Sequence, residues 1–242
     1  IVSTLKRGEH CRITNIEEKE TNRKPVAPFT TSTLQQEASL KIGFSPRRTM
    51  SVAQQLYEGN FKIPGYSGGL ITYMRTDSTT LSEESLQQAR QLILSEYGEK
   101  YSLNKPRRFA TKAKGAQEAH EAIRPVDLSM KPNDVRTHLS PEMTKLYELI
   151  WKRMIACQMT EAIIARTTLR LEGGIQQECL LEVKGHRLVF PGFLKAYTEG
   201  SDNPDVDLEK KDVILPKVEK GEKLGIKEVI SEQHFTKPPP RY

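Results

Sequence analysis

The order of helix-forming and strand-forming segments constrains the fold of this chain more than any other feature. Between residues 30 and 160, capping residues repeatedly precede amphipathic runs of helical spacing. The flanks, residues 1–29 and 161–242, carry short β-branched runs separated by glycine and proline. We therefore expect a multidomain α and β chain, in which both flanks build one β domain and a mainly helical domain, residues 30–160, is inserted into it.

The individual elements can be placed by their caps and turn residues. Thr30 to Ser32, Ser45, Ser82 and Ser140 offer N-caps, and Pro46 and Pro141 suit first helical positions. The expected helices are 33–43, 46–59, 83–97, 116–123 and 141–159. The expected strands are 1–8, 10–19, 69–73, 165–172, 177–184 and 187–190, with two or three more between 213 and 235.

Charge and cysteine usage narrow the class of protein. The net charge is +6, which favours a polyanionic partner, although solubility alone could explain it. The 3 cysteines, Cys11, Cys157 and Cys179, are far apart and form no CxxC motif, which argues against a disulfide framework and against a structural zinc in this chain. We find no apolar run long enough to span a membrane and no signal peptide, so we expect a cytoplasmic protein with no membrane partner.

The segment Gly69–Thr79, GLITYMRTDST, carries the strongest chemical signal. Tyr73, Arg75 and Asp77 stand at every second position, so they share one face if the chain stays extended. A phenol, a guanidinium and a carboxylate can act in phosphoryl transfer as nucleophile, charge clamp and orienting acid. The alternative is a strand-end tyrosine beside an Arg–Asp surface pair.

A second signal lies in QEAHEAIRP. On a helix, Gln117, His120 and Arg124 fall on roughly one face, and the histidine could donate a hydrogen bond or shuttle a proton. A surface helix with a satisfied histidine is the alternative. The zinc motif HExxH fails here because Arg124 replaces the second histidine.

Two further segments are charged. The run Lys105 to Lys114 has the composition of a nucleic-acid-binding loop, or of a solvated one, and contains Arg107, Arg108 and Lys112 around Phe109. Asp205, Asp207 and Glu209 spell DxDxE, but no apolar strand precedes them, so we interpret them as an acidic loop and not as a magnesium site.

Taken together, these segments resemble the type IA DNA topoisomerases, and specifically the bacterial topoisomerase I branch. The matching stretches are PFTTSTLQQEAS (28–39), GLITYMRTDST (69–79), QEAHEAIRP (117–125), LYELIWKRMIACQM (146–159) and QHFTKPPPRY (233–242). Met74 stands where the topoisomerase III branch usually has proline. The resemblance covers nearly the whole chain.

The resemblance implies residue roles. Tyr73 would be the nucleophile that forms a 5′-phosphotyrosine link to one DNA strand, with Arg75 and His120 beside the scissile phosphate. The other expected site or DNA-binding residues are Thr72, Asp77, Ser78, Gln117, Glu118, Arg124, Arg107, Arg108 and Lys112. Residues 1–29 and 161–242 would form the arch around a central hole, and the helical domain would carry the tyrosine.

The resemblance also implies what lies elsewhere. In this family the Mg²⁺-binding acids belong to a Toprim domain that these residues do not match, so we expect no metal ligands, no ATP and no zinc in this chain. The chain would be a central fragment of a monomeric, bacterial, nucleoid-associated isomerase that relaxes negative supercoils, and would be inactive alone. Its partners would be single-stranded and negatively supercoiled DNA and the enzyme's own Toprim and remaining domains.

Two other classes stay open from the residues. One is a DNA-binding module without chemistry, which convergence of Tyr73, Arg75 and His120 in a structure would disfavour. The other is a tyrosine recombinase, which needs an Arg-His-Arg set and a tyrosine near the end of a helical domain. Here the tyrosine comes early, which disfavours a recombinase.

Overall fold

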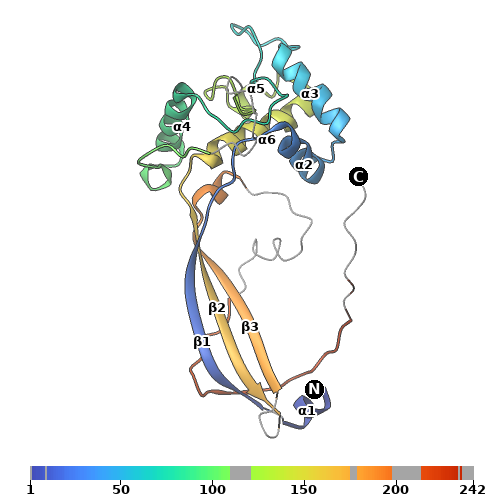
Figure 1. Cartoon of the computed structure of the whole chain (residues 1–242), viewed down its shortest axis with the longest axis vertical. Coiled ribbons are helices and arrows are strands. Elements are labelled where there is room, and N and C mark those ends of the chain that lie inside the picture. The colour runs from blue at the N-terminus through green and yellow to red at the C-terminus, as the bar shows by residue number, and fades with distance from the viewer. Residues whose placement is uncertain are drawn as a thin grey trace. The chain divides into compact units, whose positions relative to one another are not determined.

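The computed structural model describes residues 2–8, 10–109, 121–174, 179–197, 214–233 and 235 (Figure 1). The chain divides into two compact units. Of the described residues, one unit contains 2–21, 164–188 and 214–235, and the other contains 22–163 and 189–197. The predicted combination of a strand-rich part with an inserted helical part is confirmed. The predicted domain boundaries at residues 29 and 160 stay a prediction. In the structure, residues 189–197 belong to the same unit as the helices.

The helical unit is built around one long helix. Helix α6 (Pro141–Cys157) packs against α2 (Thr31–Ile42), α3 (Pro46–Glu58), α4 (Glu83–Glu96) and the short α5 (Pro132–Val135). Figure 1 shows α6 lying among these helices. Its apolar positions, including Leu146, Tyr147 and Ile150, are fully buried. Two 3-10 turns complete the unit, η1 (Glu99–Tyr101) and η2 (Gly192–Lys195).

Four of the predicted helix starts are confirmed, because they rest on local chemistry. The side chains of Thr30, Ser45, Ser82 and Ser140 each accept a hydrogen bond from a backbone N–H in the first turn of the following helix. These bonds satisfy donors that the helix itself leaves free. Pro46 and Pro141 occupy first helical positions, as predicted, and Gly43 and Gly59 end α2 and α3 in the left-handed conformation.

The strand-rich unit is organised by a sheet of order β3-β2-β1-β4. The strands are β1 (His10–Arg23), β2 (Ala162–Gly173), β3 (Cys179–Phe190) and β4 (Lys223–Gly225). β4 runs antiparallel to the start of β1, with Cys11 opposite Leu224. A small apolar core of Cys11, Ile13, Leu169 and Leu171 lies on one face of this sheet. All three cysteines are buried and free.

Several predicted strands are wrong. Val2–Gly8 forms helix α1 instead of a strand, and its Leu5 packs over Gly173, where an added Cβ would lie 2.9 Å from Leu5 Cδ2. Tertiary packing therefore overrides the β-branched composition there. Gly185 does not divide β3, and residues 214–233 contain β4 as their one strand. Within the described ranges, no helix combines the length and apolarity that a membrane crossing requires.

Candidate active site

The segment that carries Tyr73 is buried at its start but is not the predicted strand. Leu70 and Ile71 are each 1% exposed, and Ile71 forms an isolated β-bridge with Pro125. The backbone partners come from separate places: Leu70 N–H donates to the Leu56 carbonyl at 2.8 Å, and Val126 N–H donates to the Leu70 carbonyl at 3.0 Å. Because no single neighbouring strand supplies these bonds, the segment is held without belonging to a sheet.

Beyond Ile71, exposure alternates along the segment. Tyr73, Arg75 and Asp77 are exposed, and the intervening Met74, Thr76 and Ser78 are buried. The phenol, guanidinium and carboxylate therefore lie on the solvent side of one segment, although a bend occurs at residues 74 and 75. Tyr73 is 41% exposed, which leaves its side chain accessible to a large substrate. Tyr73 and Arg75 are therefore both accessible from solvent.

Tyr57, at the last turn of α3, contacts the Tyr73 ring. The two ring centroids are 5.4 Å apart and the rings meet edge to face at 64°. Such a pair stabilises the ring orientation by about 1 kcal/mol. Nothing in the local spacing of Tyr57 within α3 indicates a contact across the 59–69 loop.

Gly69 makes the approach of α3 to the segment possible. A Cβ at this position would lie 1.9 Å from the Tyr57 carbonyl oxygen. The Tyr66 hydroxyl donates to the Gly69 carbonyl at 2.7 Å. The loop, the helix end and the Tyr73 segment therefore form one packed junction.

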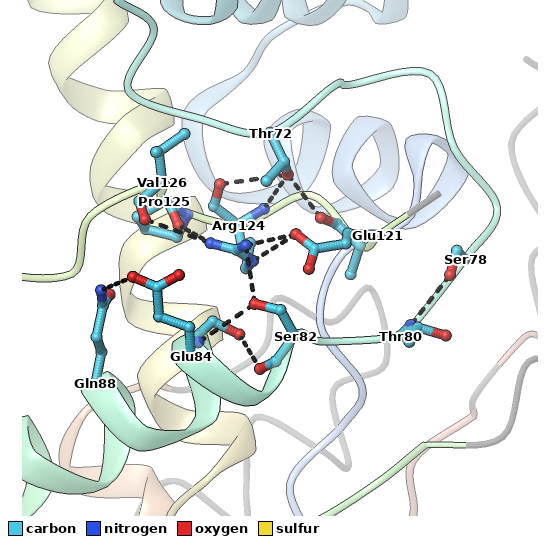
Figure 2. A network of polar contacts seen from close by, with 12 residues as sticks. Thr72, Ser78, Thr80, Ser82, Glu84, Gln88, Glu121, Arg124, Pro125 and Val126 are labelled. Atoms are coloured by element: carbon cyan, nitrogen blue, oxygen red, sulfur yellow. Dashed lines mark hydrogen bonds and ion pairs between the residues drawn. The ribbon is translucent and has the colours of Figure 1, made fainter. Parts of the chain in front are cut away.

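Thr72 ties the segment to residues 122–126 (Figure 2). Its hydroxyl donates to the Ala122 carbonyl at 2.7 Å and accepts from Arg124 N–H at 3.0 Å. Thr72 N–H donates to the Arg124 carbonyl at 2.9 Å. Thr72 thus has a positional role directly before the tyrosine.

The Arg124 side chain forms hydrogen bonds within the protein. Its guanidinium donates to Glu121, to the Ser82 hydroxyl at 3.2 Å and to the Pro125 carbonyl at 2.8 Å, and the side chain is only 11% exposed (Figure 2). These bonds connect the cap of α4 to the 121–126 segment. The geometry supports a structural role for Arg124, and its predicted role toward DNA stays a prediction.

The predicted residues Gln117, Glu118, His120 and Lys112 lie outside the described residues, as do Asp205, Asp207 and Glu209. The helix predicted for 116–123 is wrong at its end, because residues 121–123 are not helical. Ala122 N–H donates to the Thr80 carbonyl at 2.9 Å, and Ile123 N–H donates to the Phe29 carbonyl at 2.8 Å. Non-local partners thus replace the helical bonds that the spacing suggested.

The two arginines of the basic loop differ in environment. The Arg107 guanidinium donates to the carbonyls of Cys157 and Met159, both at 2.8 Å, at the end of α6. Burial lowers the pKa of Arg107. Arg108 is exposed and pairs with Glu83 at 2.6 Å. Arg107 therefore satisfies carbonyls at and just after the end of α6, and the predicted role of Arg108 toward DNA stays a prediction.

Replacing Arg107 with alanine is expected to lower the free energy of unfolding by about 2 kcal/mol, because two carbonyls at the end of α6 lose their donor. Arg108→Ala removes an exposed ion pair and is expected to change stability by less than about 0.5 kcal/mol. Urea denaturation of the two variants measures the difference. Equal stabilities for the two variants would contradict the structural role of Arg107.

The remaining predicted residues shape the end of the segment. The Ser78 hydroxyl accepts from Thr80 N–H at 3.1 Å, and Ser78 N–H donates to the Thr76 hydroxyl at 3.0 Å. Ser78 is 5% exposed, whereas Asp77 is exposed. Ser78 therefore stabilises the backbone between residues 76 and 80, and Asp77 is exposed like Tyr73. Among the residues that the structure describes, no group of three or more His, Cys, Asp or Glu side chains could hold a metal ion.

Comparison with known proteins defines the family. The family model described as DNA topoisomerase matches residues 1–242. The chain therefore belongs to the DNA topoisomerase family. Within it, the chain is 46% identical over 238 residues to the DNA topoisomerase 1 of Rickettsia bellii, and 46% identical over 230 residues to that of Xylella fastidiosa. These matches cover 98% and 95% of this chain, and they confirm the resemblance to the bacterial topoisomerase I branch.

A solved structure supports the same assignment. The full-length topoisomerase I from Thermotoga maritima superposes with a TM-score of 0.73 at 32% identity, over 90% of this chain. The match covers 33% of that structure, and this chain spans 29% and 28% of the Rickettsia and Xylella relatives. The similarity therefore concerns about a third of a topoisomerase I, and it does not assign the activity of the whole enzyme to this chain.

Proposed function

We propose that this chain is the part of a type IA DNA topoisomerase that supplies the nucleophilic tyrosine, Tyr73. The observation that carries the proposal is the placement of Tyr73 and Arg75 on the exposed side of a segment whose alternate residues are buried. The membership of the DNA topoisomerase family makes a DNA phosphodiester the matching substrate.

The proposed reaction is a reversible transesterification. The Tyr73 hydroxyl oxygen attacks a phosphorus atom in single-stranded DNA, the bond from phosphorus to the 3′ oxygen breaks, and the strand leaves with a free 3′-OH. A 5′-phosphotyrosine results, and attack by the 3′-OH restores the strand after the other strand has passed. The bond energy is kept in the phosphotyrosine, so relaxation of negative supercoils needs no ATP.

The neighbouring residues have complementary roles in this proposal. An unassisted phenol is a weak nucleophile at neutral pH. Arg75, two residues away on the same exposed side, can stabilise both the phenolate and the charge on the phosphoryl oxygens. His120 is proposed to donate a hydrogen bond to the phosphate or to accept the phenolic proton. Asp77 would orient the guanidinium group of Arg75.

We propose that the Mg²⁺ ligands of the whole enzyme come from a Toprim domain and that this chain alone does not relax DNA. The other proposed partners are single-stranded and negatively supercoiled DNA. We propose a monomeric bacterial enzyme that acts at the nucleoid.

The test is to identify the residue that becomes linked to DNA. The full-length enzyme is mixed with a single-stranded oligonucleotide, the covalent complex is trapped with denaturant, and the digested adduct is sequenced by mass spectrometry. We expect the nucleotide on Tyr73, attached through the 5′ phosphate. A nucleotide on any other residue would refute the assignment.

A further inference from the structure

The segment 28–39 matches the family but has no role in the reaction proposed above. It contains the run Thr30 to Thr33, which begins helix α2. Thr30 caps the helix, and its hydroxyl and that of Thr33 bond reciprocally to the backbone N–H groups of this turn. The capping box accounts for Thr30 and Thr33 but not for Thr31.

The Thr31 side chain turns to the Tyr73 segment. Its hydroxyl oxygen lies 2.8 Å from the Met74 carbonyl oxygen and 2.8 Å from the Thr76 nitrogen. The Thr76 carbonyl accepts from Thr31 N–H at 2.9 Å. The Thr31 hydroxyl oxygen also lies 3.1 Å from this Thr76 carbonyl oxygen. Since the Thr76 carbonyl already has a backbone donor and the Met74 carbonyl is closer, the single hydroxyl proton is assigned to Met74, and the hydroxyl oxygen accepts from Thr76 N–H.

These bonds surround one residue. Met74 and Thr76 flank Arg75, and both are buried, at 0% and 7% exposure. The Thr31 hydroxyl therefore closes a bridge between the carbonyl before Arg75 and the amide after it. This bridge fixes the backbone from which the Arg75 side chain projects to solvent.

The residues just before Thr31 are held in place by several contacts. Phe29, two residues earlier, is fully buried, and its carbonyl accepts from Ile123 N–H at 2.8 Å. The Arg153 guanidinium stacks 4.8 Å from the Phe29 ring centroid and donates to the Ala27 carbonyl at 2.7 Å. The same short stretch thus contacts both the Tyr73 segment and the 121–126 segment.

We infer that Thr31 is a positioning residue for DNA cleavage, which holds the Met74–Thr76 backbone so that Arg75 and Tyr73 face the scissile phosphate together. The inference rests on the proposed function, in which Tyr73 is the nucleophile. It gives the 28–39 segment a role in the chemistry through Arg75, without contact to DNA.

The experiment compares three variants in the full-length enzyme. Thr31→Val keeps the shape of the side chain but removes the bridge, and Thr31→Ser keeps the hydroxyl. Thr49→Val is the matched control, because the buried Thr49 hydroxyl donates to the carbonyl of Ser45, the N-cap of α3, and not to a carbonyl of the Tyr73 segment. Three quantities are measured: the single-turnover rate of covalent adduct formation, the affinity for a single-stranded oligonucleotide, and hydrogen exchange at the Thr76 amide.

We expect Thr31→Val to lower the rate of adduct formation by about 100-fold, as misplacement of a reacting group does. Oligonucleotide affinity should stay unchanged, and the Thr76 amide should exchange faster. Thr31→Ser should restore both the rate and the protection, and Thr49→Val should resemble the wild type.

Adduct formation at the wild-type rate in Thr31→Val, with Tyr73 as the linked residue, would overturn the positioning role and leave the proposed function intact. A rate loss that Thr31→Ser does not restore would also overturn it, because the hydroxyl would then not be responsible. Attachment of DNA to a residue other than Tyr73 would instead overturn the proposed function. The exchange of the Thr76 amide reports on the bridge in either case.

Discussion

Tyr73→Phe in the full-length enzyme is expected to abolish the covalent DNA adduct, with a loss of at least about 1000-fold in its rate of formation, because the variant has no nucleophilic oxygen. The fold should survive. The ring that contacts Tyr57 at 5.4 Å is retained, and Tyr73 is 41% exposed, so loss of the hydroxyl creates no internal cavity. Adducts are measured on denaturing gels with an end-labelled oligonucleotide.

The structure offers a matched control for this experiment. Tyr57 is 40% exposed and contacts the Tyr73 ring, so Tyr57→Phe removes a hydroxyl from a similarly exposed tyrosine next to the proposed nucleophile. This variant should form the adduct normally and unfold at the same urea concentration as the wild type. Adducts in Tyr73→Phe, or their loss in Tyr57→Phe, would show that the nucleophile is misassigned.

The features that the sequence predicted correctly depend on neighbours in the chain. Each predicted cap acts within one helical turn, so Thr30, Ser45, Ser82 and Ser140 could be identified from short motifs. The predicted strands at residues 1–8 and 69–73 are wrong because the structure of these segments depends on residues far away in the chain. Leu5 packs over Gly173, and the backbone of Leu70 bonds to residues 56 and 126.

The candidate site shows the same division. The alternation of Tyr73, Arg75 and Asp77 with buried neighbours follows from an extended backbone and was predictable from spacing. The Tyr57 contact joins residues that are 16 positions apart, and the Thr31 bridge joins residues that are 43 and 45 positions apart. No local sequence pattern indicates either contact. Arg107 lies in a loop whose composition is typical of nucleic-acid binding. Its carbonyl partners at the end of α6 are 50 and 52 residues away in the chain, so the sequence did not indicate them.

Gly69→Ala is expected to lower the free energy of unfolding by about 3 kcal/mol or more, because the new methyl group would overlap backbone atoms. Its Cβ would lie 1.9 Å from the Tyr57 carbonyl oxygen and 2.7 Å from the carbonyl carbon. Neither atom can move without shifting the end of α3. Such a shift would break the bond from Leu70 N–H to the Leu56 carbonyl, which anchors the segment ahead of Tyr73.

Gly65→Ala separates this overlap from the general effect of replacing a loop glycine. A Cβ at Gly65 would meet no atom within 4 Å, but Gly65 has a φ of +74°, so alanine there should cost about 1 kcal/mol. Urea denaturation compares the two variants, and adduct formation is measured under conditions where both are folded. Since Gly69 holds α3 against the Tyr73 segment, Gly69→Ala should also slow adduct formation, whereas Gly65→Ala should not. Equal unfolding midpoints would contradict the close approach of α3 to Gly69 and, with it, this account of how the nucleophile is held.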